Sequence, residues 1–188
     1  DEWVFWGTGN EVAPEVLAWA KQYAHAFASY TDPSQSDNPY IFNPKTPQKS
    51  FVSPRSLHRA SFIIKKRGLI TKNALEVALA GTIGESAARD MVAYVDVADS
   101  LPTWEDIMRD PSRANVPSSP AALCILAYAA LQKIDRTSIN KWFEYMQRTS
   151  TELQSVFCLS AVQSESKKDI VMSSKVFVDW MRAKSYLF

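Results

Sequence analysis

The run Val52-Ser53-Pro54-Arg55-Ser56 combines residue types and spacing suited to binding an anion. Ser53 suits the N-cap of a helix, because its hydroxyl oxygen can accept a hydrogen bond from a free backbone N–H, and Pro54 suits the first helical position. Arg55 would then project from the first turn, beyond the end of the helix. A guanidinium beside the free N–H groups of a helix start is suited to bidentate contact with phosphate oxygens. These residues alone favour an ordinary surface arginine over a phosphate contact, because an arginine after Ser-Pro is common.

A complete catalytic site is not expected in this chain. The sequence contains no GxxxxGK[ST] phosphate loop, no HExxH zinc motif and no GxSxG nucleophile motif. The two histidines, His25 and His58, are interpreted as exposed or packed helix residues rather than as metal ligands or general bases. We therefore predict no metal site, and an autonomous hydrolase is not the favoured interpretation.

Charge and cysteine content narrow the class of protein further. Lys and Arg number 21 and Asp and Glu number 20, for a net charge of +1. This balance gives no overall reason to bind nucleic acid or an anionic membrane, although a local basic patch can still exist. Cys124 and Cys158 lie in separate apolar runs, which favours buried thiols in a reducing cytoplasm. No apolar run reaches the roughly 20 residues of a membrane-spanning helix.

The pattern of apolar residues predicts an all-α fold, because they recur at three- and four-residue steps and strand-like alternation is nearly absent. A first helix is expected from Pro14 to near Tyr30. The proline-rich residues 31–52 are expected to form a loop that Tyr40, Ile41 and Phe42 pin to the body of the protein.

Capping signals predict where the later helices begin and end. Four residues suit an N-cap and two glycines suit a helix end: Ser53, Thr71, Thr103 and Ser119 for the starts, and Gly68 and Gly81 for the ends. Residues 110–119, with Pro111 and Pro117, form a candidate linker between two helical units. Further helices are expected over residues 138–147, 151–163 and 173–184.

The order of several motifs resembles the C-terminal region of MoxR-like AAA+ ATPases, including phage-type members. Ser53-Pro54-Arg55 and the following helix resemble the sensor-2 start of the lid. Residues 79–88 (LAGTIGESAA) resemble the lid's AGTVGEAAA-type stretch, and residues 101–107 (LPTWEDI) resemble the LP-x-x-E-x-I turn after it. Residues 3–19 are similar to the segment after the arginine-finger region, and residues 120–180 to the helical C-terminal extension. The similarity thus spans nearly the whole chain.

The resemblance implies three parts. Residues 1–52 would be a lead-in helix and Pro-rich loop, residues 53–110 a helical AAA+ lid-like subdomain, and residues 118–188 a C-terminal extension that forms a second small helical bundle. The nucleotide-binding core, which holds ATP and Mg²⁺ in the family, would lie upstream of Asp1, so this chain is expected to bind neither alone. Whether the chain is complete stays open, since a first residue other than Met fits both processing and a fragment.

The resemblance also assigns a site and partners. In the family, the residue matched by Arg55 reaches the γ-phosphate of ATP and reports its presence to the lid, and Ser53 and Pro54 support the helix start. Arg59 is interpreted as a surface ion-pair residue. The implied function is ATP sensing coupled to the remodelling of a partner. The implied partners are the upstream core, neighbouring subunits of a ring and, as in some relatives, a von Willebrand A-domain protein.

Two other functions stay open. A stand-alone helical interaction module without nucleotide binding would show an exposed apolar groove instead of a basic pocket around Arg55. A nucleic-acid binder would use the tail's aromatic residues to stack bases, but their helical spacing favours core packing. These residues are Trp142, Phe143, Tyr145, Phe157, Phe177 and Trp180.

Overall fold

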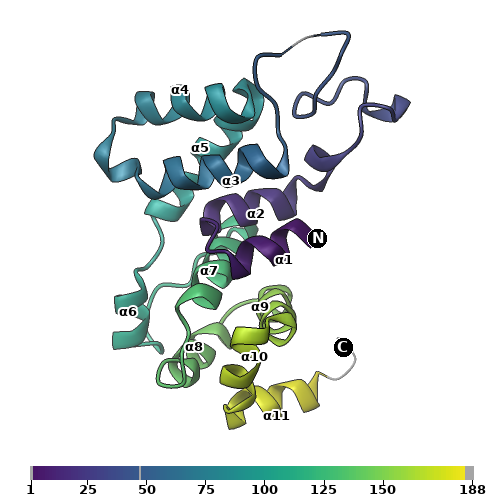
Figure 1. Cartoon of the computed structure of the whole chain (residues 1–188). Coiled ribbons are helices and arrows are strands. Elements are labelled where there is room, and N and C mark those ends of the chain that lie inside the picture. Colours follow the sequence, from purple (N-terminus) through teal and green to yellow (C-terminus); the bar gives the residue numbers. More distant parts are fainter. Residues whose placement is uncertain (1, 47, 185–188) are drawn as a thin grey trace. The chain divides into compact units, whose positions relative to one another are not determined.

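The computed structural model describes residues 2–46 and 48–184, and all regular structure in this part of the chain is helical (Figure 1). The prediction of an all-α fold is confirmed. The chain divides into two compact units, Asp1–Asp99 and Ser100–Phe188. None of the helices among the described residues is long and apolar enough to cross a membrane.

The first unit is built around the helices that follow the Pro-rich loop. Its α-helices are α1 (Glu2–Gly9), α2 (Pro14–Gln22), α3 (Pro54–Lys65), α4 (Lys72–Ile83) and α5 (Glu85–Asp99), and its 3-10 turns are η1 (Ala24–Phe27), η2 (Pro33–Gln35) and η3 (Arg67–Leu69). Helix α4 packs against α3 and α5, and α2 packs against α5. Fully buried Trp19, Leu57, Ile64, Leu79 and Met91 join these helices. The lead-in helix α2 is therefore part of the same core as the predicted lid.

Helix starts follow the capping prediction. The side chains of Ser53, Thr71, Thr103 and Ser119 each accept a hydrogen bond from the backbone N–H three residues later. Pro54 and Pro120 occupy the first helical position after their capping serines. These starts were predictable because the cap and the receiving N–H lie within four consecutive residues, and a proline marks two of the four.

Helix ends follow the glycine prediction less well. Helix α4 continues through Gly81 to Ile83 and is capped by Gly84, which has a φ of 88°. The predicted end at Gly81 is wrong because the helix meets its required left-handed residue one turn later. Gly84 also lies where a Cβ would approach the carbonyl oxygen of Ser50 to 3.0 Å, whereas a Cβ at Gly81 meets no atom within 4 Å. Gly68 lies inside η3 and has no positive φ.

The first predicted helix is shorter than expected. Helix α2 ends at Gln22, and the ring of Tyr23 stacks on Trp19 with centroids 5.0 Å apart. Tyr40 returns from the loop to contact both rings edge-on, and its hydroxyl donates to Asp90 at 2.7 Å. This aromatic packing replaces the last turns of the predicted helix. Tyr40 and Ile41 are buried as expected, but Phe42 remains 39% exposed.

The second unit contains α6 (Trp104–Arg109), α7 (Pro120–Lys133), α8 (Ile139–Met146), α9 (Thr151–Gln163), α10 (Glu165–Met172) and α11 (Lys175–Ala183). Helix α7 packs against α9, and α8 contacts both α6 and α11. The tail's aromatic residues lie in this core: Trp142, Phe143, Tyr145, Phe157 and Phe177 are fully buried, and Trp180 is 8% exposed. The prediction of core packing is confirmed. Residues 185–188 of the predicted extension lie outside the described part.

The boundary between the units lies earlier than the predicted linker. Residues 100–110 were expected to end the lid, but Trp104 of α6 packs on Trp142 with centroids 5.9 Å apart. The Pro-rich residues 110–119 also belong to the second unit. Arg148 donates to the carbonyl oxygens of Pro111 and Ala114, and the Tyr145 hydroxyl donates to that of Asn115. These long-range hydrogen bonds fix a segment that its composition marks as a linker.

Candidate functional site at the start of α3

The start of α3 is held in place by reciprocal hydrogen bonds. The Ser53 hydroxyl accepts from the Ser56 N–H at 3.1 Å, and the Ser56 hydroxyl accepts from the Ser53 N–H at 2.8 Å. The Ser56 hydroxyl also lies 2.9 Å from the carbonyl oxygen of Phe51. This arrangement is a capping box in which serine replaces the usual Glu or Gln, and it fixes the direction in which the helix begins.

The loop before α3 is anchored at two further points. The Val52 N–H donates to the Tyr40 carbonyl oxygen at 2.7 Å, and the Ser50 hydroxyl donates to the carbonyl oxygen of Ala80 at 2.6 Å. The second bond joins the loop to α4. The helix start that carries Arg55 therefore has a fixed position within the first unit.

Arg55 occupies the second helical position and is exposed. Among residues 2–46 and 48–184, its side chain makes no hydrogen bond or ion pair. Since arginine keeps its charge at all physiological pH values, the guanidinium is available to an external anion. The positive end of the helix dipole lies beside it and favours the same kind of ligand.

The sequence around Arg55 contains no carboxylate over a long stretch. Residues 38–75 include no Asp or Glu, and their Lys and Arg residues are Lys45, Lys49, Arg55, Arg59, Lys65, Lys66, Arg67 and Lys72. Lys72 pairs with Asp96 and Arg67 pairs with two acidic residues, so these two charges are neutralised within the unit. Arg55 lies in the part of the stretch that keeps its positive charge. The balanced net charge hides this local excess, which sequence analysis left only as an open alternative.

A shallow hollow of about 400 Å³ lies beside the start of α3. Its lining combines Ser53 and Pro54 with the half-exposed rings of Phe27, Tyr30 and Phe42. Sequence analysis did not identify it, because the rings come from η1, the loop and the segment before α3. The structure thus places an aromatic surface next to the basic helix start.

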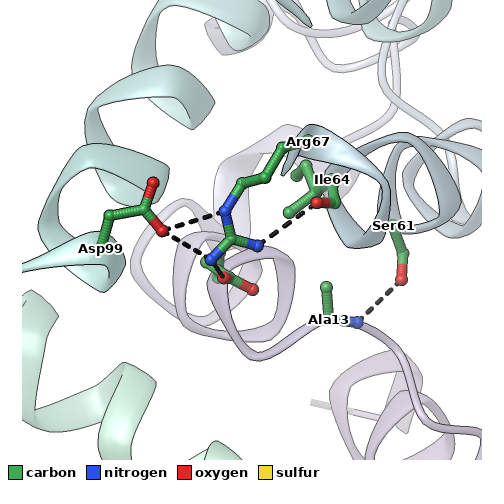
Figure 2. Close-up of polar contacts among 6 residues, drawn as sticks. Ala13, Ser61, Ile64, Arg67 and Asp99 are labelled. Carbon is green, nitrogen blue, oxygen red and sulfur yellow. Dashed lines mark hydrogen bonds and ion pairs between the residues drawn. The ribbon is translucent and has the colours of Figure 1, made fainter. Parts of the chain in front are cut away.

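Arg67 begins η3, directly after α3, and its guanidinium joins three elements (Figure 2). It lies 2.7 Å from Asp99 of α5 and 3.2 Å from buried Glu15 of α2, and it donates to the Ile64 carbonyl oxygen at 3.3 Å. Burial opposes its charge, but the hydrogen bond to Asp99 and the two carboxylates outweigh that effect and raise the pKa of Arg67.

A second polar contact in the same region joins α2 to α3. The N–H of Ala13, directly before α2, donates to the buried Ser61 hydroxyl at 2.7 Å (Figure 2). With the Arg67 contacts, it fixes α2 and α3 relative to each other. The candidate site therefore stands on a firmly connected group of helices.

In the part of the chain that the structure describes, no group of three or more His, Cys, Asp or Glu side chains could hold a metal ion. His25 is exposed and contacts Tyr23 and Tyr40, and His58 is half-buried between aromatic rings. His25 is thus an exposed side chain with ring contacts, and His58 is partly packed.

Searches among protein-family models, curated proteins and solved structures gave no match to this chain.

Proposed function

We propose that this chain is the helical lid and C-terminal extension of an AAA+ ATPase, and that it senses ATP through Arg55. One observation carries the proposal: Arg55 is an exposed cation on a rigidly capped helix start and has no anionic partner among the described residues. Its place within the sensor-2-like sequence Ser53-Pro54-Arg55 supplies the identity of the anion, the γ-phosphate of ATP.

In this proposal ATP and Mg²⁺ are held by an α/β core outside the chain. Arg55 pairs with the phosphate, and the lid follows as a unit because the Arg67 contacts and the Ser61 hydrogen bond connect α2, α3 and α5. Loss of the phosphate on hydrolysis releases the guanidinium and so frees the lid. The motion would be passed to neighbouring subunits of a ring and to a remodelled partner, for which a von Willebrand A-domain protein is one candidate. We place the protein in the cytoplasm, which a free, buried thiol at Cys158 fits.

ATP turnover by the full-length gene product tests the proposal. Loss of a charged hydrogen bond costs about 1.5–3 kcal/mol, so Arg55→Ala should lower kcat/KM by roughly ten- to a hundredfold. Arg55→Lys should recover part of the activity, because lysine keeps the charge but lacks the bidentate fork. Arg89→Ala is the matched control, since Arg89 is an exposed arginine on α5 of the same unit. Unchanged turnover in Arg55→Ala would reject the role of Arg55.

The alternative of a stand-alone interaction module is supported by the aromatic hollow beside Ser53 and Pro54. A gene product that neither binds nor hydrolyses ATP would favour this alternative. In that case Tyr30→Ala or Phe42→Ala, which shrink the aromatic lining, should weaken partner binding more than Arg55→Ala does.

A further inference from the structure

The segment between η2 and α3 is attached to the helices of the first unit by few buried side chains. Among its described residues, 36–46 and 48–53, only Tyr40, Ile41 and Val52 are buried. The other side chains of these two stretches are exposed or half-buried. A segment with so few buried apolar contacts opens at a lower free energy than the helical core beside it.

Hydrogen bonds join this segment to two neighbouring helices. The Tyr40 hydroxyl donates to Asp90 of α5 at 2.7 Å, and the Ser50 hydroxyl donates to the Ala80 carbonyl oxygen of α4 at 2.6 Å. Burial and the hydrogen bond to Asp90 raise the pKa of Tyr40, so its hydroxyl stays protonated and remains a donor. A third bond, from the Val52 N–H to the Tyr40 carbonyl oxygen at 2.7 Å, connects the two attached stretches.

We call residues 38–41 and 50–53 the strap. The two attachments of the strap to the helices depend on each other. When Tyr40 is displaced, the Val52 N–H loses the acceptor that holds the second stretch beside the first. We therefore expect both stretches to open together.

The second stretch of the strap contacts the junction between α4 and α5. Gly84, with a φ of 88°, is the single residue between Ile83 at the end of α4 and Glu85 at the start of α5. The Ala80 carbonyl oxygen that accepts from Ser50 also accepts from the Gly84 N–H at 3.0 Å. The Ser50 carbonyl oxygen lies 3.0 Å from the position that a Cβ on Gly84 would take. The strap thus supports the residue at which the chain turns from α4 into α5.

The same stretch supports the start of α3. The Ser56 hydroxyl lies 2.9 Å from the Phe51 carbonyl oxygen and accepts from the Ser53 N–H at 2.8 Å. The Ser53 carbonyl oxygen in turn accepts the first hydrogen bond of the helix, from the Leu57 N–H at 2.9 Å. The start of α3 and the end of α4 therefore both depend on the position of the strap.

We propose that the strap is a conformational switch of the first unit, with the closed state that the structure shows and an open state in which Tyr40 has left Asp90. In the open state the capped start of α3 and the last turn of α4 lose their support together. The direction of Arg55, in the first turn of α3, is then fixed only while the strap is closed.

The switch goes beyond the proposed function, because it belongs to the first unit whether or not Arg55 binds ATP. A ligand that needs a fixed Arg55 binds the closed state, so its apparent affinity falls in proportion to the closed fraction. The strap would thereby regulate any anion binding at the start of α3.

Amide hydrogen exchange of the protein without nucleotide, under conditions in which closing outpaces exchange, tests the switch. The reporters are the amides of Val52, Leu57 and Gly84, which lie in the strap, at the start of α3 and at the end of α4. Tyr40→Phe keeps the ring but removes the hydrogen bond to Asp90. Loss of a hydrogen bond to a charged group should raise the open population by roughly tenfold or more, and all three amides should exchange faster by the same factor.

Two controls accompany this variant. Tyr30→Phe removes the hydroxyl of an exposed tyrosine that lies outside the strap, and it should leave the three exchange rates unchanged. The Leu75 amide, which donates to the Thr71 carbonyl oxygen at the other end of α4, is the internal reference and should keep its rate in every variant.

The attachment at Ser50 gives a second test with its own control. Ser50→Ala removes the bond to α4 and should accelerate the same three amides together. Thr82→Ala removes a comparable hydroxyl bond, to the Ala78 carbonyl oxygen at 2.7 Å, but this bond lies within α4. Thr82→Ala should therefore not accelerate exchange at Val52 or Leu57.

Equal acceleration of the three amides in both Tyr40→Phe and Ser50→Ala, with a constant rate at Leu75, would support the switch. Acceleration of the Val52 amide alone would overturn it, because the strap would then open without the ends of α3 and α4. Unchanged exchange at all three amides would overturn it as well. Acceleration that extends to the Leu75 amide would mean that the whole first unit has loosened, which would also reject a separate switch.

Discussion

The Nη2 atom of Arg67 lies 3.2 Å from the Oε1 atom of Glu15, and this ion pair joins η3, directly after α3, to the first turn of α2. The Glu15 side chain is only 7% exposed, whereas that of Arg67 is 30% exposed. A buried carboxylate is stable only with a partner, so the pair makes the position of α2 dependent on the end of α3. The proposed function needs a connection of this kind, because it has the first unit follow Arg55 as one body.

Removal of Arg67 should therefore loosen the first unit. Arg67→Met removes the guanidinium that pairs with the Glu15 carboxylate. We expect the free energy of unfolding to fall by about 2–4 kcal/mol, which is less than the full range for a buried pair because Arg67 is partly exposed. Peptide-resolved hydrogen exchange should show faster exchange in α2. The double variant Glu15→Gln with Arg67→Met should recover most of the loss.

The control for this prediction is Lys72→Met. It breaks the pair with Asp96, in which both side chains are more than half exposed, and such pairs contribute about 0–1 kcal/mol. If Lys72→Met lowered the free energy of unfolding as much as Arg67→Met does, burial of Glu15 would not explain the effect of Arg67→Met.

Alanine substitutions of two glycines, Gly81 and Gly84, should change the stability of the first unit in opposite directions. Gly84→Ala forces a side chain into a φ of 88° and toward the Ser50 carbonyl oxygen, and strain of this kind costs of order 1–3 kcal/mol. Gly81→Ala lies inside α4 with open space around the new Cβ and should stabilise the unit by about 0.5–1 kcal/mol. Urea denaturation of both variants measures these changes, and equal signs would contradict the assignment of the α4 terminus.

The contrast between these glycines shows how far the sequence could predict the fold. A glycine near the end of an apolar pattern marks a helix stop, but the selection of Gly84 over Gly81 depends on the loop at Ser50, which is distant in sequence. The starts at Ser53 and Thr71 needed only local information and were predicted correctly. The boundary after Asp99 was not, because Tyr145 and Arg148 bind the segment that its prolines mark as a linker.

The candidate site also combines features that neighbouring residues predict with features that depend on contacts between distant residues. Arg55 and its helix start follow from four consecutive residues, whereas the contact of Trp6 with His58 joins two helices and could not be read from spacing. The excess of positive charge was visible in the sequence as the absence of Asp and Glu from residues 38–75. The balanced total charge left this local excess only as an open alternative.

In the second unit, Gln154 should be a critical polar residue. Its buried side chain accepts from the Trp180 indole N–H at 2.8 Å and donates to the carbonyl oxygens of Thr149 at 3.0 Å and Met146 at 3.4 Å. Gln154→Ala removes all three hydrogen bonds and leaves a cavity, so we expect the free energy of unfolding to fall by about 2–4 kcal/mol. Gln163→Ala, at an exposed position of the same helix, should change stability by less than about 0.5 kcal/mol. Thermal unfolding measures the difference. Equal melting temperatures for Gln154→Ala and Gln163→Ala would contradict the stabilising role of Gln154.

The turn before α8 should respond to strong acid. The Asp135 carboxylate accepts hydrogen bonds from the hydroxyl and N–H groups of Thr137 and Ser138, and these bonds lower the pKa of Asp135 from 3.8 to about 2. Because the folded pKa is depressed, the stabilisation is present above pH 4 and is lost as the pH falls through 2. NMR titration of Asp135 should give the low pKa, and Asp135→Asn should abolish the change in the Thr137 and Ser138 amide signals over this range. A titration midpoint near 4 would contradict the hydrogen bonding of this turn.

The capping box should couple helix stability to the function of Arg55. Ser53→Ala removes the bond from the Ser56 N–H, and N-cap losses of this type cost about 1 kcal/mol. The frayed first turn would no longer hold Arg55 in a fixed direction, so KM for ATP in the full-length gene product should rise while the fold is kept. Ser119→Ala removes the equivalent cap of α7 at a similar loss of stability and is the matched control, since α7 carries no part of the site. If both variants changed KM equally, the effect would come from stability alone; a rise confined to Ser53→Ala would tie the orientation of Arg55 to its capped helix start.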